Sequence, residues 1–109
     1  MPIYHKNLLK GKWPEMTLCE QLGNVGSEIH RAKNWQGRDE ALSRRAIDRA
    51  LELMDFVMSD PRWRGRMKEI ARAREMIVDA SLGGKEYGST FEDLDNYFFG
   101  FALAARLKK

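Results

Sequence analysis

The rest of the 109-residue chain is arranged around residues 60–82, DPRWRGRMKEIARAREMIVDASL. Proline cannot continue a preceding helix, but it suits the first position of a new helix that an aspartate caps. Asp60 and Pro61 therefore separate two antiparallel helices, one before residue 60 and one over 61–82. The two glycines after Leu82 end the later helix. Apolar side chains follow the helix over 61–82 at the spacing of a core face: Trp63, Met67, Ile70, Ile77 and Val78.

The N-terminal half of the chain predicts two further helices. Thr17 and Glu20 have the spacing of a capping box, in which each side chain bonds the other residue's backbone N–H. The first helix should therefore begin at Thr17. The segment 34–39 is a polar turn, after which Asp39 or a neighbour caps a second helix over 40–59.

The C-terminal part predicts a fourth helix. Ser89 and Glu92 form a second capping box, so this helix should span about Thr90 to Leu107. The four helices together predict an all-α fold, an antiparallel four-helix bundle. The expected organisation is a short irregular N-terminal arm at 1–16 and a helical bundle domain at 17–109.

The first helix pairs a core face with a strip that has almost no side-chain bulk. The core face repeats every three or four residues: Leu18, Leu22, Val25, Ile29 and Ala32. Gly23 and Gly26 lie beside it, and a glycine inside a helix costs up to about 1 kcal/mol relative to alanine. We therefore expect another helix to approach closely at these two glycines.

The second helix is apolar over about half of its circumference, which predicts burial on that side. The apolar arc consists of Ala46, Ile47, Ala50, Leu51, Leu53, Met54, Val57 and Met58. Phe56 falls outside it, on the polar face. This side chain is either a second packing contact or an exposed anchor for a partner.

The fourth helix carries two apolar stripes. The first consists of Phe91, Leu94, Phe98, Phe101 and Ala105, and the second of Phe99, Leu103 and Leu107. In so small a domain no helix is fully surrounded, so the second stripe predicts self-association, although both stripes also fit a monomeric bundle. The candidate oligomer or partner interface consists of Phe56, Phe99, Leu103 and Leu107.

Positive charge concentrates in the third helix. The chain has a net charge of +3, and its segment 61–79 holds six basic residues against three acidic ones. Several cations on one rigid surface suit phosphate oxygens. The alternative is a solvated face that forms salt bridges with the acidic second helix. The candidate nucleic-acid-binding residues are Arg62, Arg64, Arg66, Lys68 and Arg72.

Arg74 is a separate case, because its position falls within the apolar arc of the third helix. A charge in such a place must find a partner or extend to solvent. Glu28 and Asp95 are the candidate carboxylates for a structural ion pair. The other interpretation places Arg74 at an oligomer interface.

The sequence predicts no catalytic residue, no metal and no cofactor. The single Cys19 cannot form an internal disulfide and has no metal-ligand spacing around it. His30 lies about three helical turns from Cys19, too far for a catalytic pair. Because no catalytic residue is predicted, we expect that the protein is not an enzyme. The chain has neither an apolar run of membrane-spanning length nor a secretory signal, so we expect a cytoplasmic location.

The loop at 83–90, GGKEYGST, superficially resembles a phosphate-binding loop because it leads into a helix N-terminus. The residue order differs from that of a P-loop, and no strand precedes it. A helix stop followed by a helix cap explains every residue. Phosphate binding is the alternative.

Three phrases of the chain resemble those of small bacterial helical proteins: residues 20–28, 60–66 and 86–90. In length, helix layout and basic character the chain is similar to the four-helix-bundle family that includes proteins encoded in ribosomal-RNA intervening sequences and accessory proteins of diversity-generating retroelements. The resemblance implies a ring-like homo-oligomer, commonly a pentamer. It further implies that the protein binds RNA or DNA through a basic surface and docks a reverse transcriptase.

These observations lead to two hypotheses. The first is a non-enzymatic helical bundle whose basic third helix contacts nucleic acid. The alternative is a protein–protein interaction module with no nucleic-acid role, which uses Phe56, Phe99 and Leu103 to dock a partner. Salt-dependent binding and its loss on charge reversal distinguish the two.

Overall fold

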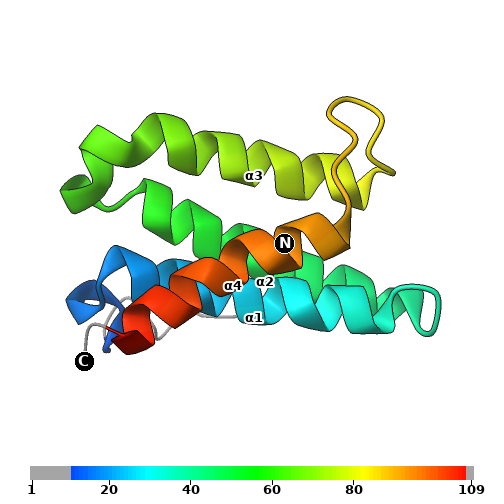
Figure 1. Ribbon diagram of the computed structural model, residues 1–109, viewed down its shortest axis with the longest axis horizontal. Coiled ribbons are helices and arrows are strands. Elements are labelled where there is room, and N and C mark those ends of the chain that lie inside the picture. The colour runs from blue at the N-terminus through cyan, green and yellow to red at the C-terminus, as the bar shows by residue number, and fades with distance from the viewer. Residues whose placement is uncertain (1–10, 108–109) are drawn as a thin grey trace.

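The protein is an all-α bundle, as its computed structural model shows for residues 11–107 (Figure 1). The helices of this described part are α1 (Leu18–Trp35), α2 (Glu40–Met58), α3 (Met67–Ser81) and α4 (Phe91–Leu107). Two short 3-10 helices, η2 (Trp13–Glu15) and η3 (Pro61–Arg66), precede α1 and α3. None of the helices within residues 11–107 is long and apolar enough to cross a membrane.

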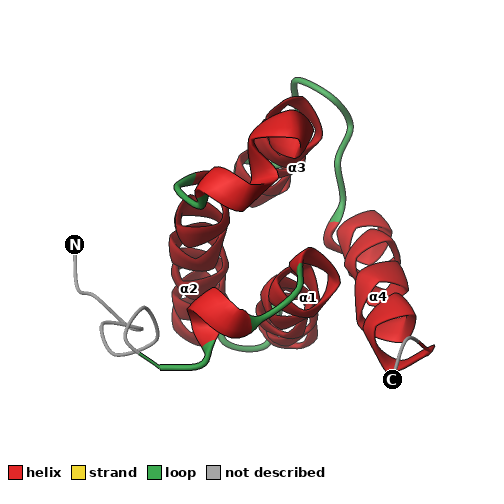
Figure 2. Cartoon of the chain, turned by 90° about the vertical axis from the view of Figure 1, so that its left-hand side faces the viewer, coloured by secondary structure: helices red, strands yellow, loops and turns green. Residues whose placement is uncertain are grey.

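Consecutive helices run in opposite directions, so the bundle is antiparallel (Figure 1). Helix α1 is central and packs extensively against both α2 and α4. Helix α3 packs mainly against α2 and touches α4 little, and Figure 2 shows it set apart from α4. The bundle is therefore uneven: α3 stands at its edge and presents a large part of its surface to solvent.

The core lies where α1 meets α2 and α4. Every residue of the predicted α1 core face is buried, and so is most of the predicted arc of α2. Helix α4 contributes Phe91, Leu94 and Phe98, the first part of its first stripe. The apolar periodicities of these three helices were therefore predicted correctly.

The two glycines of α1 lie against α4, as predicted. A Cβ atom on Gly23 would be 3.2 Å from Ala102 Cα, and one on Gly26 would be 2.8 Å from Phe98 Cβ. A Cβ on Gly23 would press on α4, and one on Gly26 would force an atom of α4 to shift. The missing bulk lets the backbones of α1 and α4 come together.

The predicted helix starts at Thr17 and Asp39 are confirmed. Thr17 and Glu20 form the capping box, with bonds of 2.9 and 3.1 Å, and Asp39 caps α2. The predicted N-cap residue of α4 was wrong by one position. Thr90 is the cap and accepts from the backbone N–H of Asp93, whereas the backbone N–H of Ser89 bonds elsewhere.

The third helix differs from the single element that the sequence predicts. Asp60 does cap a new helical segment after α2, but residues 61–66 form the 3-10 helix η3, which has non-helical torsion angles at Trp63. The two helix types have different periods, so the core face changes phase at Met67. The buried residues of α3 are Ile70, Ala73, Ile77, Asp79 and Ala80. Trp63, Met67 and Val78, predicted as core, are only partly buried.

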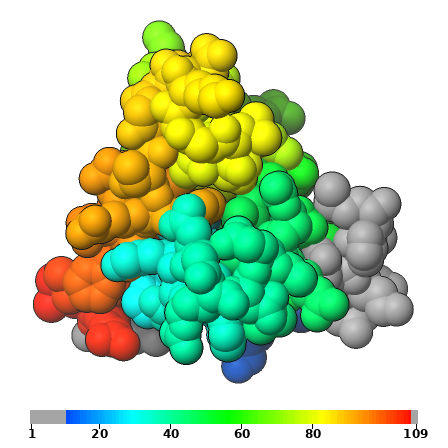
Figure 3. All heavy atoms as spheres, turned by 90° about the vertical axis from the view of Figure 1, so that its right-hand side faces the viewer, coloured from blue at the N-terminus to red at the C-terminus, as the bar shows by residue number. Residues whose placement is uncertain are grey.

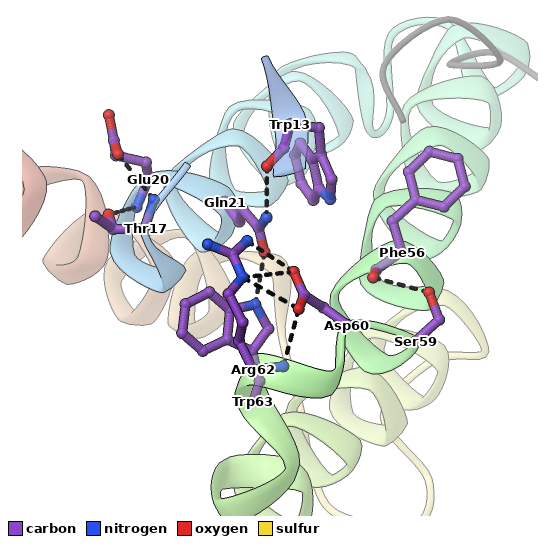
Figure 4. A network of polar contacts seen from close by, with 9 residues as sticks. All are labelled: Trp13, Thr17, Glu20, Gln21, Phe56, Ser59, Asp60, Arg62 and Trp63. Atoms are coloured by element: carbon purple, nitrogen blue, oxygen red, sulfur yellow. Dashed lines mark hydrogen bonds and ion pairs between the residues drawn. The ribbon is translucent and has the colours of Figure 1, made fainter. Parts of the chain in front are cut away.

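The N-terminal segment contacts the bundle through Trp13. Its indole is buried and meets the ring of Phe56 edge-on at 6.2 Å, while the side-chain amide of Gln21 donates to its carbonyl (Figure 4). Phe56 is thus a packing contact, one of its two predicted roles. Residues 1–10 of the predicted arm lie outside the described residues.

Candidate nucleic-acid interface

The five predicted basic residues are all exposed, but they occupy two kinds of helix. Arg62, Arg64 and Arg66 lie on η3, and Lys68 and Arg72 lie on α3. Because α3 stands at the edge of the bundle, none of the described helices buries these five side chains. We call these five residues the basic row.

Two members of the basic row already have carboxylate partners. Arg62 bonds Asp60 at 2.7 Å and stacks over the ring of Trp63 at 4.4 Å (Figure 4). The hydrogen bond from Arg62 lowers the pKa of the Asp60 carboxyl, and the same bond raises the pKa of Arg62. Arg66 pairs with Glu69 at 3.0 Å. These two guanidinium groups must share or leave a carboxylate before they bind a phosphate.

The other three members have no carboxylate partner within the described part of the chain. Arg64 and Lys68 form no ion pair with any residue of 11–107, and Arg72 lies over the ring of Tyr87, 5.0 Å from its centroid. Stacking on a tyrosine orients a guanidinium without neutralising it. Arg64, Lys68 and Arg72 are therefore the cations of the row that are available to an anionic partner.

A shallow depression of about 660 Å³ accompanies the basic row, and it is lined by residues of η3 and α3 alone. Its cations are Arg66, Lys68 and Arg72, and its acids are Glu69 and Glu75. Both acids accept hydrogen bonds from tyrosine hydroxyls. The bonded pairs are Tyr97 with Glu69 at 3.4 Å and Tyr87 with Glu75 at 3.3 Å.

These contacts raise the pKa of both tyrosines. For Tyr97 the larger cause is burial and the second is the charge of Glu69, whereas for Tyr87 the charge of Glu75 is the main cause. Both phenols therefore stay protonated at neutral pH and keep donating to the glutamates. The two carboxylates are held by partners on α4 and on the loop that follows α3.

The loop after α3 is organised around Asp79, a residue that no sequence pattern singles out. The carboxylate of this buried residue accepts from the backbone N–H groups of Glu86, Tyr87 and Ser89, at 2.9, 3.1 and 3.1 Å. Burial alone raises the pKa of Asp79, but these hydrogen bonds outweigh it and hold the pKa below its usual 3.8. The amides that a phosphate would need already hold this carboxylate, which argues against the phosphate-loop alternative.

Arg74 forms an ion pair, but the predicted partners were wrong. Its Nε donates to Asp55 Oδ1 of α2 at 2.8 Å. Glu28 instead pairs with two arginines, and Asp95 lies 3.1 Å from Nδ1 of His30. The physical reason is that α3 packs mainly against α2, which places Arg74 beside a carboxylate of α2.

The predicted interface residues separate into two places. Phe99, Leu103 and Leu107 follow one another by four residues on the outer face of α4 and are 61, 43 and 77% exposed. Phe56 lies on α2 against Trp13 and is partly buried. The structure therefore brings three of the four together and leaves Phe56 outside the group.

The described residues contain no cluster of His, Cys, Asp and Glu that could hold a metal ion. Comparisons of the chain with protein-family models, with curated proteins and with solved structures found no match. Function must therefore be inferred from the surface chemistry.

Proposed function

We propose that the protein is a non-enzymatic helical bundle that binds nucleic acid through the basic row. The observation that carries this proposal is the exposure of Arg64, Lys68 and Arg72 at the edge of the bundle without carboxylate partners among residues 11–107. Phosphates are the ligands that such a set of rigidly mounted cations attracts best. The resemblance noted above extends the proposal to an oligomeric accessory protein of a reverse transcriptase.

The proposal predicts a measurable dependence of affinity on salt. If three phosphates are neutralised, the logarithm of the binding constant should fall with the logarithm of salt concentration with a slope of about −2 to −3. Fluorescence anisotropy with a labelled RNA or DNA oligonucleotide between 50 and 200 mM salt, roughly the range over which such contacts weaken, measures this slope.

Substitutions that reverse the charge of side chains test which surface binds nucleic acid. Arg64→Glu combined with Lys68→Glu should weaken binding and reduce the slope by roughly 1.5 to 2. Arg44→Glu with Arg45→Glu is the matched control, because both arginines are exposed and lie on α2. Binding that is undetectable at low salt, or that falls equally in both double variants, would rule out the proposed surface.

One observation favours a second candidate, a protein-interaction module. Large apolar side chains rarely line up on the surface of a monomer unless they contact a partner. Phe99, Leu103 and Leu107 form such a row on α4. A second copy of the chain is the expected partner, which agrees with the homo-oligomer that the resemblance implies.

Sedimentation equilibrium tests the second candidate. The wild type should have a mass that is a multiple of 12.7 kDa, and Phe99→Asp should reduce it to that of the monomer. Leu82→Asp is the control, because Leu82 is also exposed but lies at the end of α3. A wild type that is monomeric at high concentration would contradict self-association through α4.

A further inference from the structure

Tyr87 presents a rigidly held aromatic ring at the end of the basic row. Its backbone N–H is bonded to Asp79, its hydroxyl donates to Glu75, and the guanidinium of Arg72 lies over its ring. Even so, the residue is 51% exposed. Figure 3 shows the loop that carries it on the surface, in yellow at the top. A ring anchored at both ends and open to solvent loses little conformational entropy when a ligand stacks on it.

A second depression adjoins this ring. It has a volume of about 430 Å³ and is lined in part by Tyr87, Val78, Leu82 and Lys85. Glu75 lines both depressions, and Arg72 of the first lies over the ring of Tyr87 of the second, so the two adjoin each other. We call this second depression the Tyr87 pocket.

The two depressions differ in chemistry. Val78 and Leu82 contribute apolar side chains to the Tyr87 pocket, and its charged lining is mixed, with Arg74 and Lys85 beside Glu75, Asp79 and Glu86. Arg74 is already paired with Asp55, and acids outnumber cations in the lining, so the pocket attracts a phosphate less than the basic row does. The cations of the basic row attract phosphates immediately beside it. A suitable ligand must therefore place a flat, weakly polar ring in the pocket and a negative charge outside it.

An unpaired nucleotide has this distribution of groups. In a duplex the bases are stacked on each other, whereas in a single strand they are free to stack on aromatic side chains. Lys68 and Arg72 are one helical turn apart, about 6 Å along the axis, which is comparable to the spacing of neighbouring phosphates in an extended strand. Resting on the proposed nucleic-acid function, we infer that the Tyr87 pocket takes an unpaired base of a single strand whose phosphates follow the basic row.

The test compares single-stranded and double-stranded RNA of the same length by anisotropy. Tyr87→Ala should weaken single-strand binding about 5-fold to 150-fold, the range measured for removal of a base-stacking aromatic residue, and should leave duplex binding unchanged. Tyr87→Phe is the matched control. It keeps the ring and loses only the hydrogen bond to Glu75, so it should bind single strands nearly as the wild type does.

Circular dichroism must show that Tyr87→Ala is folded, which is expected because Asp79 bonds the backbone N–H of this residue and not its side chain. Lys68→Glu should weaken the binding of both single-stranded and double-stranded RNA, because Lys68 contacts phosphates, which both forms carry.

The possible outcomes separate the two proposals. If neither RNA binds at low salt, the proposed function fails and the inference fails with it. If single-stranded and double-stranded RNA bind with equal affinity and Tyr87→Ala changes neither affinity, the nucleic-acid function stands and the stacking site is refuted. If polyglutamate of equal charge competes as well as single-stranded RNA, the site recognises acidic chains in general and the base-specific inference is overturned.

Discussion

Gly26 of α1 and Phe98 of α4 meet where no additional atom fits: a Cβ on Gly26 would lie 2.8 Å from the Cβ of Phe98. Phe98 is itself fully buried, so it cannot move aside. The contact joins the helix at the centre of the bundle to the helix that carries the exposed apolar row. The presence of glycine within α1 thus has a packing cause that offsets its helical cost.

Gly26→Ala should lower the free energy of unfolding by about 1–2 kcal/mol. Overpacking costs roughly 1–3 kcal/mol, and the better helix propensity of alanine returns up to about 1 kcal/mol of it. Gly100→Ala in α4 is the control, because nothing lies within 4 Å of the added Cβ. Gly100→Ala should raise the free energy of unfolding by about 0.5–1 kcal/mol. Urea denaturation measures both, and equal effects of the two substitutions would contradict the packing explanation.

Asp79→Asn should destabilise the protein in a pH-dependent manner. The carboxylate has a lower pKa in the folded protein than its usual 3.8, so its contribution to stability is complete above that value and is lost as the pH falls through the folded-state pKa. The stability difference between wild type and variant should be largest at neutral pH and shrink on acidification. Urea titrations at several pH values test this, and a difference independent of pH would show that the charge is unimportant.

Lys68 and Arg62 should contribute unequally to nucleic-acid binding. Lys68 has no carboxylate partner within the described chain, whereas Arg62 is bonded to Asp60. Lys68→Ala should therefore reduce the salt slope by about 0.7–0.9, while Arg62→Ala should leave it nearly unchanged. Anisotropy over a salt series gives both slopes. Equal reductions would mean that Asp60 releases Arg62 when nucleic acid binds.

Arg74 and Asp55 should show a small, salt-sensitive coupling energy. Their side chains are 34 and 60% exposed, and pairs of this kind contribute about 0.2–1 kcal/mol. A double-mutant cycle with Arg74→Gln and Asp55→Asn should detect this coupling at low salt and lose it at high salt. The same cycle with Asp95→Asn should give no coupling, because Asp95 pairs with other residues. Coupling to Asp95 would contradict the observed helix arrangement.

The sequence could predict the features that depend on neighbours along the chain. The Thr17 cap joins residues three apart, and the apolar faces of α1 and α2 follow from the helical repeat. The glycine strip also gave a correct prediction, since two glycines in one helix require a close neighbour. In each case a local energetic preference has only one common structural explanation, so no knowledge of the tertiary structure was needed.

The basic row illustrates what local reasoning missed. The sequence identified its five cations and their exposure, but it placed them on one continuous helix. It did not distinguish the paired Arg62 from the unpaired Lys68, because a count of charges carries no geometry. The Tyr87 pocket was not foreseen, since its residues come from both α3 and the loop after it.

The amino-acid order was sufficient to predict the four α-helices, most of their buried faces and the surface on which positive charge gathers. The hydrogen bond from Arg74 to Asp55, and the role of Asp79 in organising the loop that bears Tyr87, depend on the packing of the helices. Those partners are chosen by which helices lie side by side, and that choice follows from packing the whole core. Hydrogen bonds between residues 8 to 19 positions apart cannot be read from a three- or four-residue repeat.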